Sequence, residues 1–266
     1  MRLFDTHCHL QSSTLATQGS KVYDRARAAG VAGFIVMATD AGDWDDVEAL
    51  ADAQPTVLPA LGVHPWYLPD AEPESWLPAL EARLRARPPA WVGEIGLDRT
   101  AGPPLDRQEK AFEPQLALAG RLGRPASLHC RRTWDRLGWY LARRPHPEVP
   151  VVLHSFGGSV DVARQFLGYN AWFSFSGALT RTRNERLPQV VQFLPKDRVL
   201  IETDSPDLLP QDLWRENPER PNEPAHIVEV LHRLARLWGL SPDRTAEVLE
   251  ENTKKLTGLY FSGSDD

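Results

Sequence analysis

The feature that most restricts the fold of this chain is a regular alternation of short β-rich runs with helical stretches. Strands that alternate with helices are typical of parallel sheets, because each helix returns the chain to the start of the next strand. The β-rich runs are residues 2–8, 31–38, 56–62, 90–95, 125–130, 149–154, 171–176 and 198–203. The helical stretches are residues 19–29, 43–53, 74–87, 106–122, 133–143, 159–167, 183–193 and 222–238. Eight strands with eight helices predict an α/β fold, the (β/α)8 TIM barrel.

Chain length and the lack of a linker predict one domain over residues 1–266. Barrels of this type commonly have about this length, and neither a low-complexity linker nor a repeat divides the chain. Ser241-Pro242-Asp243 is typical of a helix N-cap followed by proline at the first helical position. We therefore expect a short extra C-terminal helical segment over residues 242–250.

Two further stretches carry irregular signals. Pro114 lies inside the predicted helix 106–122, so we expect either a bend there or a separate first turn. Residues 205–221 are polar, rich in proline and too long for a typical connection. Long loops that follow barrel strands often cover a substrate, which is the role we expect for this one.

Composition narrows the classes of function that the chain can have. Net charge is −6 with a pI near 5.8, which excludes a surface that is basic throughout. No apolar run has the length of a signal peptide or a membrane span, so we expect a cytoplasmic protein with no membrane contact. Two cysteines, Cys8 and Cys130, form no disulfide framework. Nothing in the sequence indicates a stable protein partner.

Histidine and acidic side chains recur at the predicted carboxyl ends of the strands. In residues 2–8 and just after, alternate side chains share a face, so His7 and His9 point the same way. The other candidate ligands at strand ends are Glu94, His129, His154 and Asp204. Positions so far apart converge only in a closed barrel, and mixed imidazole and carboxylate ligands suit zinc, manganese, iron or nickel without excluding magnesium. The pattern predicts a metal centre at the carboxyl end of the barrel.

Four residues near these ligands have predicted supporting roles. His64 lies between Gly62 and Pro65, so we expect its imidazole at the rim of the site, binding phosphate or protonating the leaving group. A histidine that merely caps the loop is the alternative. Glu202 shares a strand face with Asp204, and Asp5 with His7, so both acids are expected to orient ligands. Arg131 follows His129 and is a candidate substrate-binding residue.

Basic and aromatic residues also occur on the loops predicted to follow the strands. The arginines are Arg99, Arg131, Arg132, Arg181, Arg183, Arg215 and Arg220, and the aromatic residues are Trp66, Tyr67, Trp134 and Trp214. Arginines at this end would attract phosphate, although loop arginines are commonly just solvated. The aromatic rings are candidates for stacking on bases of a single strand, with core packing as the alternative.

Eight sequence blocks resemble, in order and spacing, the TatD family of metal-dependent hydrolases within the amidohydrolase superfamily. The blocks are DTHCHL (5–10), GVHPW (62–66), GEIGLD (93–98), LHCR (128–131), HSFGG (154–158), FSFSGALT (173–180), ETDSP (202–206) and NEPAHI (222–227). The resemblance covers almost the whole chain. It implies a TIM barrel with two divalent metal ions and metal-dependent deoxyribonuclease activity.

Carried over position by position, the resemblance also implies which residues hold each ion. His7, His9, Glu94 and Asp204 would hold one ion, and Glu94, His129 and His154 the second. Glu94 is the natural bridge, because a carboxylate has two oxygens and a neutral imidazole offers one lone pair. The ions are expected to be magnesium, manganese or zinc.

The expected function is hydrolysis of DNA phosphodiester bonds, exonuclease-like on single strands or ends, by a water activated between two metal ions. Asp204, Glu94 and His64 are the expected catalytic residues, with Asp204 as both ligand and base. DNA or another phosphodiester is the expected substrate. One alternative is a metal-dependent hydrolase of another ester or amide, including aminoacyl-tRNA deacylation. The other is a non-catalytic metal-binding barrel, which would predict a missing ligand.

Overall fold

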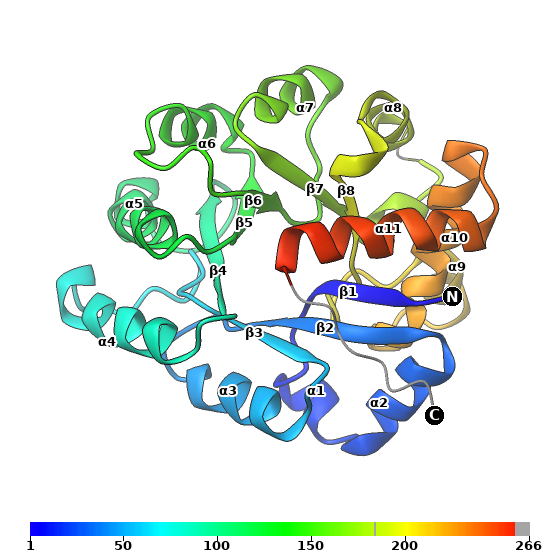
Figure 1. Ribbon diagram of the computed structural model, residues 1–266, viewed down its shortest axis with the longest axis horizontal. Coiled ribbons are helices and arrows are strands. Elements are labelled where there is room, and N and C mark those ends of the chain that lie inside the picture. The colour runs from blue at the N-terminus through cyan, green and yellow to red at the C-terminus, as the bar shows by residue number, and fades with distance from the viewer. Residues whose placement is uncertain (184, 259–266) are drawn as a thin grey trace.

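The computed structural model describes residues 1–183 and 185–258, and its strands form a ring surrounded by helices (Figure 1). Strands that are consecutive in the sequence are neighbours in one parallel sheet. They are β1 (Leu3–Cys8), β2 (Val31–Met37), β3 (Val57–Leu61), β4 (Trp91–Asp98), β5 (Ala126–Arg131), β6 (Val151–Leu153), β7 (Ala171–Phe175) and β8 (Val199–Ile201). The predicted TIM barrel is confirmed.

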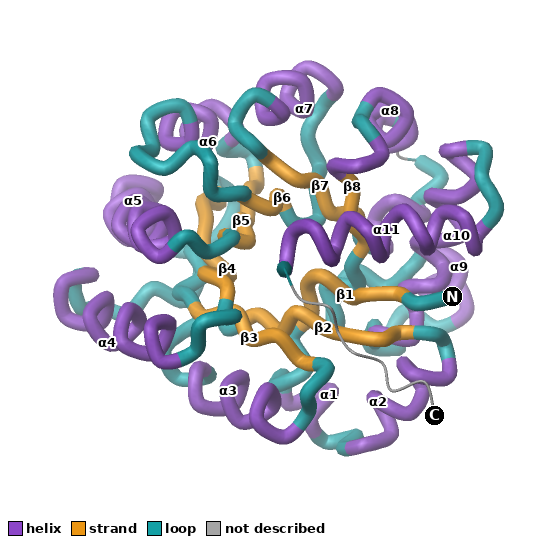
Figure 2. Tube along the Cα trace, in the orientation of Figure 1, coloured by secondary structure: helices purple, strands orange, loops and turns teal. Residues whose placement is uncertain are grey.

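Each predicted helical stretch contains a helix, and the helices lie outside the ring of strands (Figure 2). The α-helices are α1 (Ser13–Ala16), α2 (Ser20–Ala28), α3 (Trp44–Ala53), α4 (Pro73–Ala86), α5 (Leu105–Leu122), α6 (Trp134–Leu141), α7 (Val160–Leu167), α8 (Arg186–Phe193), α9 (Gln211–Glu216), α10 (Ile227–Trp238) and α11 (Pro242–Thr257). Short 3-10 helices are η1 (Gly177–Thr180), η2 (Lys196–Arg198) and η3 (Pro224–His226).

Several boundaries differ from the prediction. The extra C-terminal helix α11 has 16 residues, so it is not the short segment expected over 242–250. Helix α5 continues through Pro114 without a separate first turn. The long loop 205–221 contains α9. Strand β4 continues beyond the predicted residues 90–95 to Asp98, which places Glu94 inside the strand.

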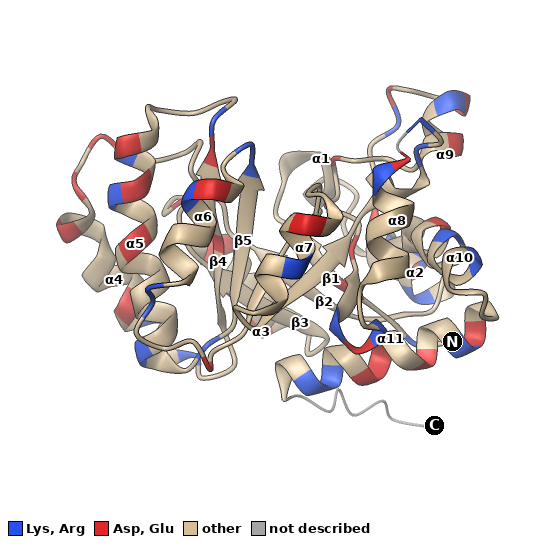
Figure 3. Cartoon of the chain, turned by 90° about the horizontal axis from the view of Figure 1, so that it is seen from above, with Lys and Arg blue, Asp and Glu red and all other residues tan. Residues whose placement is uncertain are grey.

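Helix α11 closes the amino-terminal end of the barrel (Figures 1 and 3). Its Asn252 donates hydrogen bonds from Nδ2 to the carbonyls of Lys196 and Val199, at 2.7 and 2.8 Å. Its Leu256 joins the apolar side chains inside the barrel, which are Ile35, Met37, Leu58, Ala60, Trp91, Val152, Trp172 and Leu200. The larger apolar cluster lies between the strands and the outer helices. Both faces of the sheet are therefore buried, as parallel sheets require, and the carboxyl ends of the strands lie at the opposite end from α11.

The seam between β8 and β1 is closed by backbone and side-chain hydrogen bonds at the carboxyl end. Asp204 N donates to His7 O at 2.9 Å, and His9 N donates to Ser205 O at 2.8 Å. The Asp5 carboxylate accepts from Thr203 N at 2.9 Å and from Thr203 Oγ1 at 2.5 Å. Burial raises the pKa of Asp5 to about 7. The structure thus places Asp5 in the seam, where it meets the backbone N–H of His7 at 3.4 Å instead of the expected imidazole.

Candidate metal centre

The six predicted ligands meet around the carboxylate of Glu94, which is buried in the interior of β4. One group of atoms gathers at Oε2 of Glu94. His7 Nε2 lies 3.2 Å from this oxygen and His9 Nε2 lies 3.7 Å from it. Asp204 Oδ1 is 3.6 Å from His7 Nε2 and 3.7 Å from His9 Nε2. Strands β1 and β4 and the turn after β8 thus supply one cluster of nitrogen and oxygen atoms.

A second group gathers at the other oxygen of the same carboxylate. His154 Nε2 lies 2.9 Å from Glu94 Oε1, and His129 Nδ1 lies 3.0 Å from it. The two imidazole nitrogens are 3.2 Å apart. Oε2 of Glu94 therefore faces His7 and His9, and Oε1 faces His129 and His154 together with His64, whose Nε2 lies 3.4 Å away.

The remote nitrogen of each of these four histidines has a neighbour that orients the ring. His9 Nδ1 donates to Met37 O at 2.9 Å, and His129 Nε2 donates to Asp98 Oδ2 at 2.9 Å. The remaining two contacts are His7 Nδ1 to Ser127 Oγ at 3.1 Å and His154 Nδ1 to Glu202 Oε1 at 3.5 Å. Because a carbonyl or carboxylate only accepts, the contacts of His9 and His129 leave the lone pair of a neutral ring on the nitrogen that faces Glu94. The Ser127 hydroxyl beside His7 can donate or accept, and His154 Nδ1 makes no hydrogen bond within the described residues.

The distances fit metal coordination. Two donors about 2.1 Å from one ion, at angles of about 90–110°, lie roughly 3.0–3.4 Å apart. The separations above, 2.9 to 3.7 Å, lie within about 0.3 Å of this range. His7 Nε2 is also a buried atom without a hydrogen-bond partner in the described part of the chain, which is costly unless something else binds it. The residues present therefore fit a metal centre.

The charge balance of the cluster also attracts cations. Burial alone would raise the pKa of Glu94, but the imidazoles of His154, His64 and His7 hold that pKa well below its usual range. Burial would lower the pKa of His9, but Asp204 and Glu94 outweigh it and raise the pKa to about 9. The carboxylates are therefore ionised, and without metal they favour the protonated form of His9, whose proton a metal ion would replace.

His64 lies deeper than its predicted position at the rim. It is 4% exposed, and its Nε2 is 3.4 Å from Glu94 Oε1. The backbone N–H of Trp66 donates to His64 Nδ1 at 3.1 Å, so a neutral ring carries its proton on Nε2. That proton removes the lone pair a metal would need, so His64 presents a donor to the centre.

Asp98 is the residue of the centre that the sequence interpretation missed. Its Oδ2 accepts from both His129 Nε2 and Trp66 Nε1, at 2.9 and 2.8 Å. Its Oδ1 accepts from the N–H and hydroxyl of Thr100, both at 2.6 Å. The signal was present, because Asp98 ends the block GEIGLD, but the predicted strand stopped at residue 95. Ser127 was also missed, although it lies two residues before His129 and so shares its strand face.

The predicted basic and aromatic residues separate into two sets. Arg99, Arg215 and Arg220 are paired with Asp135, Asp212 and Glu216. Within the described residues, Arg131, Arg132, Arg181 and Arg183 have no ion-pair partner, and all four are exposed.

Trp134 packs against Phe156 and Phe166, so it is not available for stacking. Trp66, Tyr67 and Trp214 are exposed.

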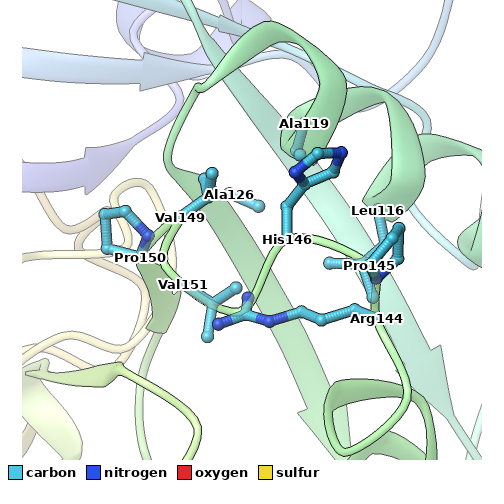
Figure 4. Close-up of a pocket in the computed structure, with 10 residues that line it drawn as sticks. Leu116, Ala119, Ala126, Arg144, Pro145, His146, Val149, Pro150 and Val151 are labelled. Carbon is cyan, nitrogen blue, oxygen red and sulfur yellow. The ribbon is translucent and has the colours of Figure 1, made fainter.

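A small hollow elsewhere in the molecule is not part of this centre. Arg144, His146 and Pro150 line it together with residues at the starts of β5 and β6 (Figure 4). The starts of these strands are at the end of the barrel opposite His129 and His154.

None of the described helices is both long and apolar enough to cross a membrane.

Comparisons with known proteins identify the family of the chain. The family model described as TatD related DNase matches residues 4–258. The chain is 36% identical over 258 residues to the uncharacterized metal-dependent hydrolase YjjV of Escherichia coli K12, covering 96% of this chain and 97% of that protein. It is 32% identical over 262 residues to the 3'-5' ssDNA/RNA exonuclease TatD of Citrobacter koseri, covering 97% and 100%.

Solved structures show the same relationship. The crystal structure of YjjV, a TatD homolog from Escherichia coli K12, matches with a TM-score of 0.90 and 34% identity over 97% of this chain and 98% of that one. A mutant PTE-like lactonase from Deinococcus radiodurans matches with a TM-score of 0.64 at 14% identity, covering 96% and 95%, and this likeness shows the fold alone. The chain belongs to the TatD-related DNase family of metal-dependent hydrolases.

Proposed function

We propose that this enzyme hydrolyses phosphodiester bonds at the ends of single-stranded DNA, using two divalent ions held by six residues. His7, His9, Glu94 and Asp204 would hold the first ion, and Glu94, His129 and His154 the second. The observation that carries the proposal is the position of Glu94, whose Oε2 faces the nitrogens of His7 and His9 and whose Oε1 faces those of His129 and His154, with His64 also near Oε1. A carboxylate in this position can bridge two cations.

The donor set restricts the ions without selecting one. Imidazole nitrogens suit zinc and manganese, and carboxylate oxygens suit manganese and magnesium. We propose magnesium, manganese or zinc as the native ions. When bound, two divalent ions would lower the pKa of a water molecule and stabilise negative charge on the phosphate.

Asp204 has the position of a ligand that also removes a proton. Its Oδ1 faces His7 and His9, which leaves Oδ2 to accept the proton of the attacking water. The oxygen of that water forms a bond to phosphorus, the bond between phosphorus and the sugar oxygen breaks, and the departing sugar oxygen takes up a proton from solvent. The φ angle of Asp204 is 57°, an uncommon conformation for a residue other than glycine, and it is typical of functional sites.

His64 is proposed to bind the phosphate. Burial lowers the pKa of His64, so the imidazole is neutral near pH 7. A neutral ring with its proton on Nε2 is a hydrogen-bond donor and a poor acid. Of the two expected roles, this favours phosphate binding over protonation of the leaving group.

Two observations support a nucleic-acid substrate. The relative from Citrobacter koseri is named as a 3'-5' ssDNA/RNA exonuclease. Arg131 and Arg132 follow His129 at the carboxyl end of the barrel and lack ion-pair partners among the described residues, so they are free to bind phosphates. Lysine or arginine positions also lie beyond the end of β5 (Figure 3), whereas Arg215 and Arg220 near α9 are paired with acidic side chains. We propose that a single strand enters here with its 3' end.

The test combines substrate range with metal content. The enzyme, depleted with a chelator and then supplied with each metal, is assayed on labelled single-stranded DNA, duplex DNA, RNA and a small phosphodiester. Glu94→Gln should lose activity and both ions by elemental analysis, whereas Glu74→Gln on the exposed face of α4 should lose neither. Cleavage of no nucleic acid, with turnover of an amide or carboxylic ester, would contradict the proposal. Retention of both ions by Glu94→Gln would contradict the bridge.

A further inference from the structure

Two exposed aromatic rings stand directly against the candidate metal centre. Trp66 is 37% exposed and Tyr67 is 49% exposed, and both follow His64 in the loop after β3. The Trp66 ring meets the imidazole of His64 edge to face, with centroids 5.0 Å apart, and that of His129 at 5.6 Å. The Tyr67 ring lies 5.6 Å from His64. These rings extend the wall of the centre toward solvent.

The polar end of the Trp66 indole is fixed to a buried charge. Its Nε1–H donates to Asp98 Oδ2 at 2.8 Å, and the same oxygen accepts from His129 Nε2. Asp98 is only 1% exposed, and its other oxygen is occupied by Thr100. A single carboxylate therefore holds the exposed indole and the metal-facing imidazole in one arrangement.

The loop after β4 supports the same indole from behind. Gly102 has a φ of 82°, and a Cβ there would lie 2.8 Å from the carbonyl oxygen of Pro65 and 3.1 Å from the Cα of Trp66. Only glycine allows this approach. Pro65 also restricts the backbone immediately before Trp66. The ring is thus positioned before any ligand binds, which reduces the entropy lost on binding.

The chemistry of this surface indicates its ligand. Because the indole N–H is already bonded, the exposed remainder of Trp66 is an aromatic surface that suits a flat, unpaired ring. We infer that Trp66, with Tyr67 beside it, is the stacking surface for the terminal base of the strand whose phosphodiester is cleaved. This inference rests on the proposed function. A paired base at a duplex end is not free to stack, so the surface also selects single strands.

The experiment compares two 5'-labelled oligonucleotides that differ only in the last 3' residue, which is either thymidine or an abasic tetrahydrofuran. Both carry the same terminal phosphodiester. Stacking of one base on an aromatic side chain is expected to favour the natural end by about 5- to 100-fold in kcat/KM, mainly through KM. The same preference should appear in binding, measured by fluorescence anisotropy with the metal removed by chelation.

Substitutions then assign the preference to the ring. Trp66→Leu should reduce the ratio to near one, and Trp66→Phe, which keeps a ring without the N–H, should retain most of it. Trp139→Leu is the matched control, since Trp139 on α6 is 42% exposed and its ring lies against Arg136 and Arg143. Elemental analysis should find unchanged metal content in Trp66→Leu, which separates loss of stacking from damage at His129.

The possible results are distinct. Equal kcat/KM and equal binding of the two oligonucleotides by the wild-type enzyme would overturn the stacking surface. A Trp66→Leu enzyme that discriminates as well as the wild type would also overturn it. If the metal-loaded wild type cleaves neither oligonucleotide, the proposed function fails, and the anisotropy ratio still decides whether Trp66 binds a base.

Discussion

Replacing Asp98 with asparagine should weaken one metal position of the centre and spare the other. Asp98 supplies the charged acceptor for His129 Nε2, and asparagine keeps the size of the side chain without the charge. Loss of such a partner typically costs about 10- to 100-fold in metal affinity, or roughly 1.4–2.8 kcal/mol. The loss of affinity should occur at the metal position formed by His129 and His154, because His129 is the histidine that Asp98 contacts.

The assay is a titration of metal-depleted enzyme with zinc or manganese in the presence of a competing chelating indicator. Wild-type enzyme should bind two equivalents, and Asp98→Asn should show one of the two steps weakened. Ser127→Ala is the matched control, because Ser127 Oγ lies 3.1 Å from Nδ1 of His7 in the other cluster. Ser127→Ala should lose less metal affinity, because the hydroxyl that it removes is neutral. This loss should fall on the other binding step. If Asp98→Asn weakens both binding steps equally, or neither, Asp98 does not support the metal position of His129 and His154 in particular, and the reasoning is refuted.

Three further changes test other parts of the structure. Asp204→Asn should lower kcat by roughly 100-fold or more with a smaller change in KM, and equal losses in both would make Asp204 only a ligand. His64→Gln should lower turnover without changing metal content by elemental analysis, whereas loss of an ion would show that His64 binds metal after all. Phe173→Ala, which removes a fully buried ring from β7, should cost about 3–5 kcal/mol in urea unfolding, and a cost under about 1 kcal/mol would contradict the packing.

The strand order, and the meeting of the six candidate ligands at one end of the barrel, could be predicted from the sequence because both depend on local patterns. Each candidate ligand lies within or directly after a β-rich run, and His7 and His9 share a face by simple alternation. The end of β4 could not be predicted in the same way. Gly96 has a φ of 154° and pairs with His129, so the strand continues to Asp98 through pairing with β5. That pairing is a tertiary contact, and the local sequence does not contain it.

The depth of His64 depends on distant partners in the same manner. His64 N donates to Thr39 O at 2.8 Å, and Val63 N donates to Gln115 Oε1 at 2.8 Å. These bonds draw the loop after β3 into the barrel. Pro65 indicates a turn, but nothing near it in the sequence indicates which residues form hydrogen bonds with the backbone of that turn.

The seam between β8 and β1 has a consequence for folding stability. His7 and His9 lie on one side of this junction and Asp204 on the other, so the first ion would join the first and last strands of the sheet directly. An ion that binds only the folded chain stabilises it by about 2.7 kcal/mol at a free concentration of 100 times its Kd. Amide hydrogens at this junction should therefore exchange faster in the metal-depleted protein than in the metal-loaded protein.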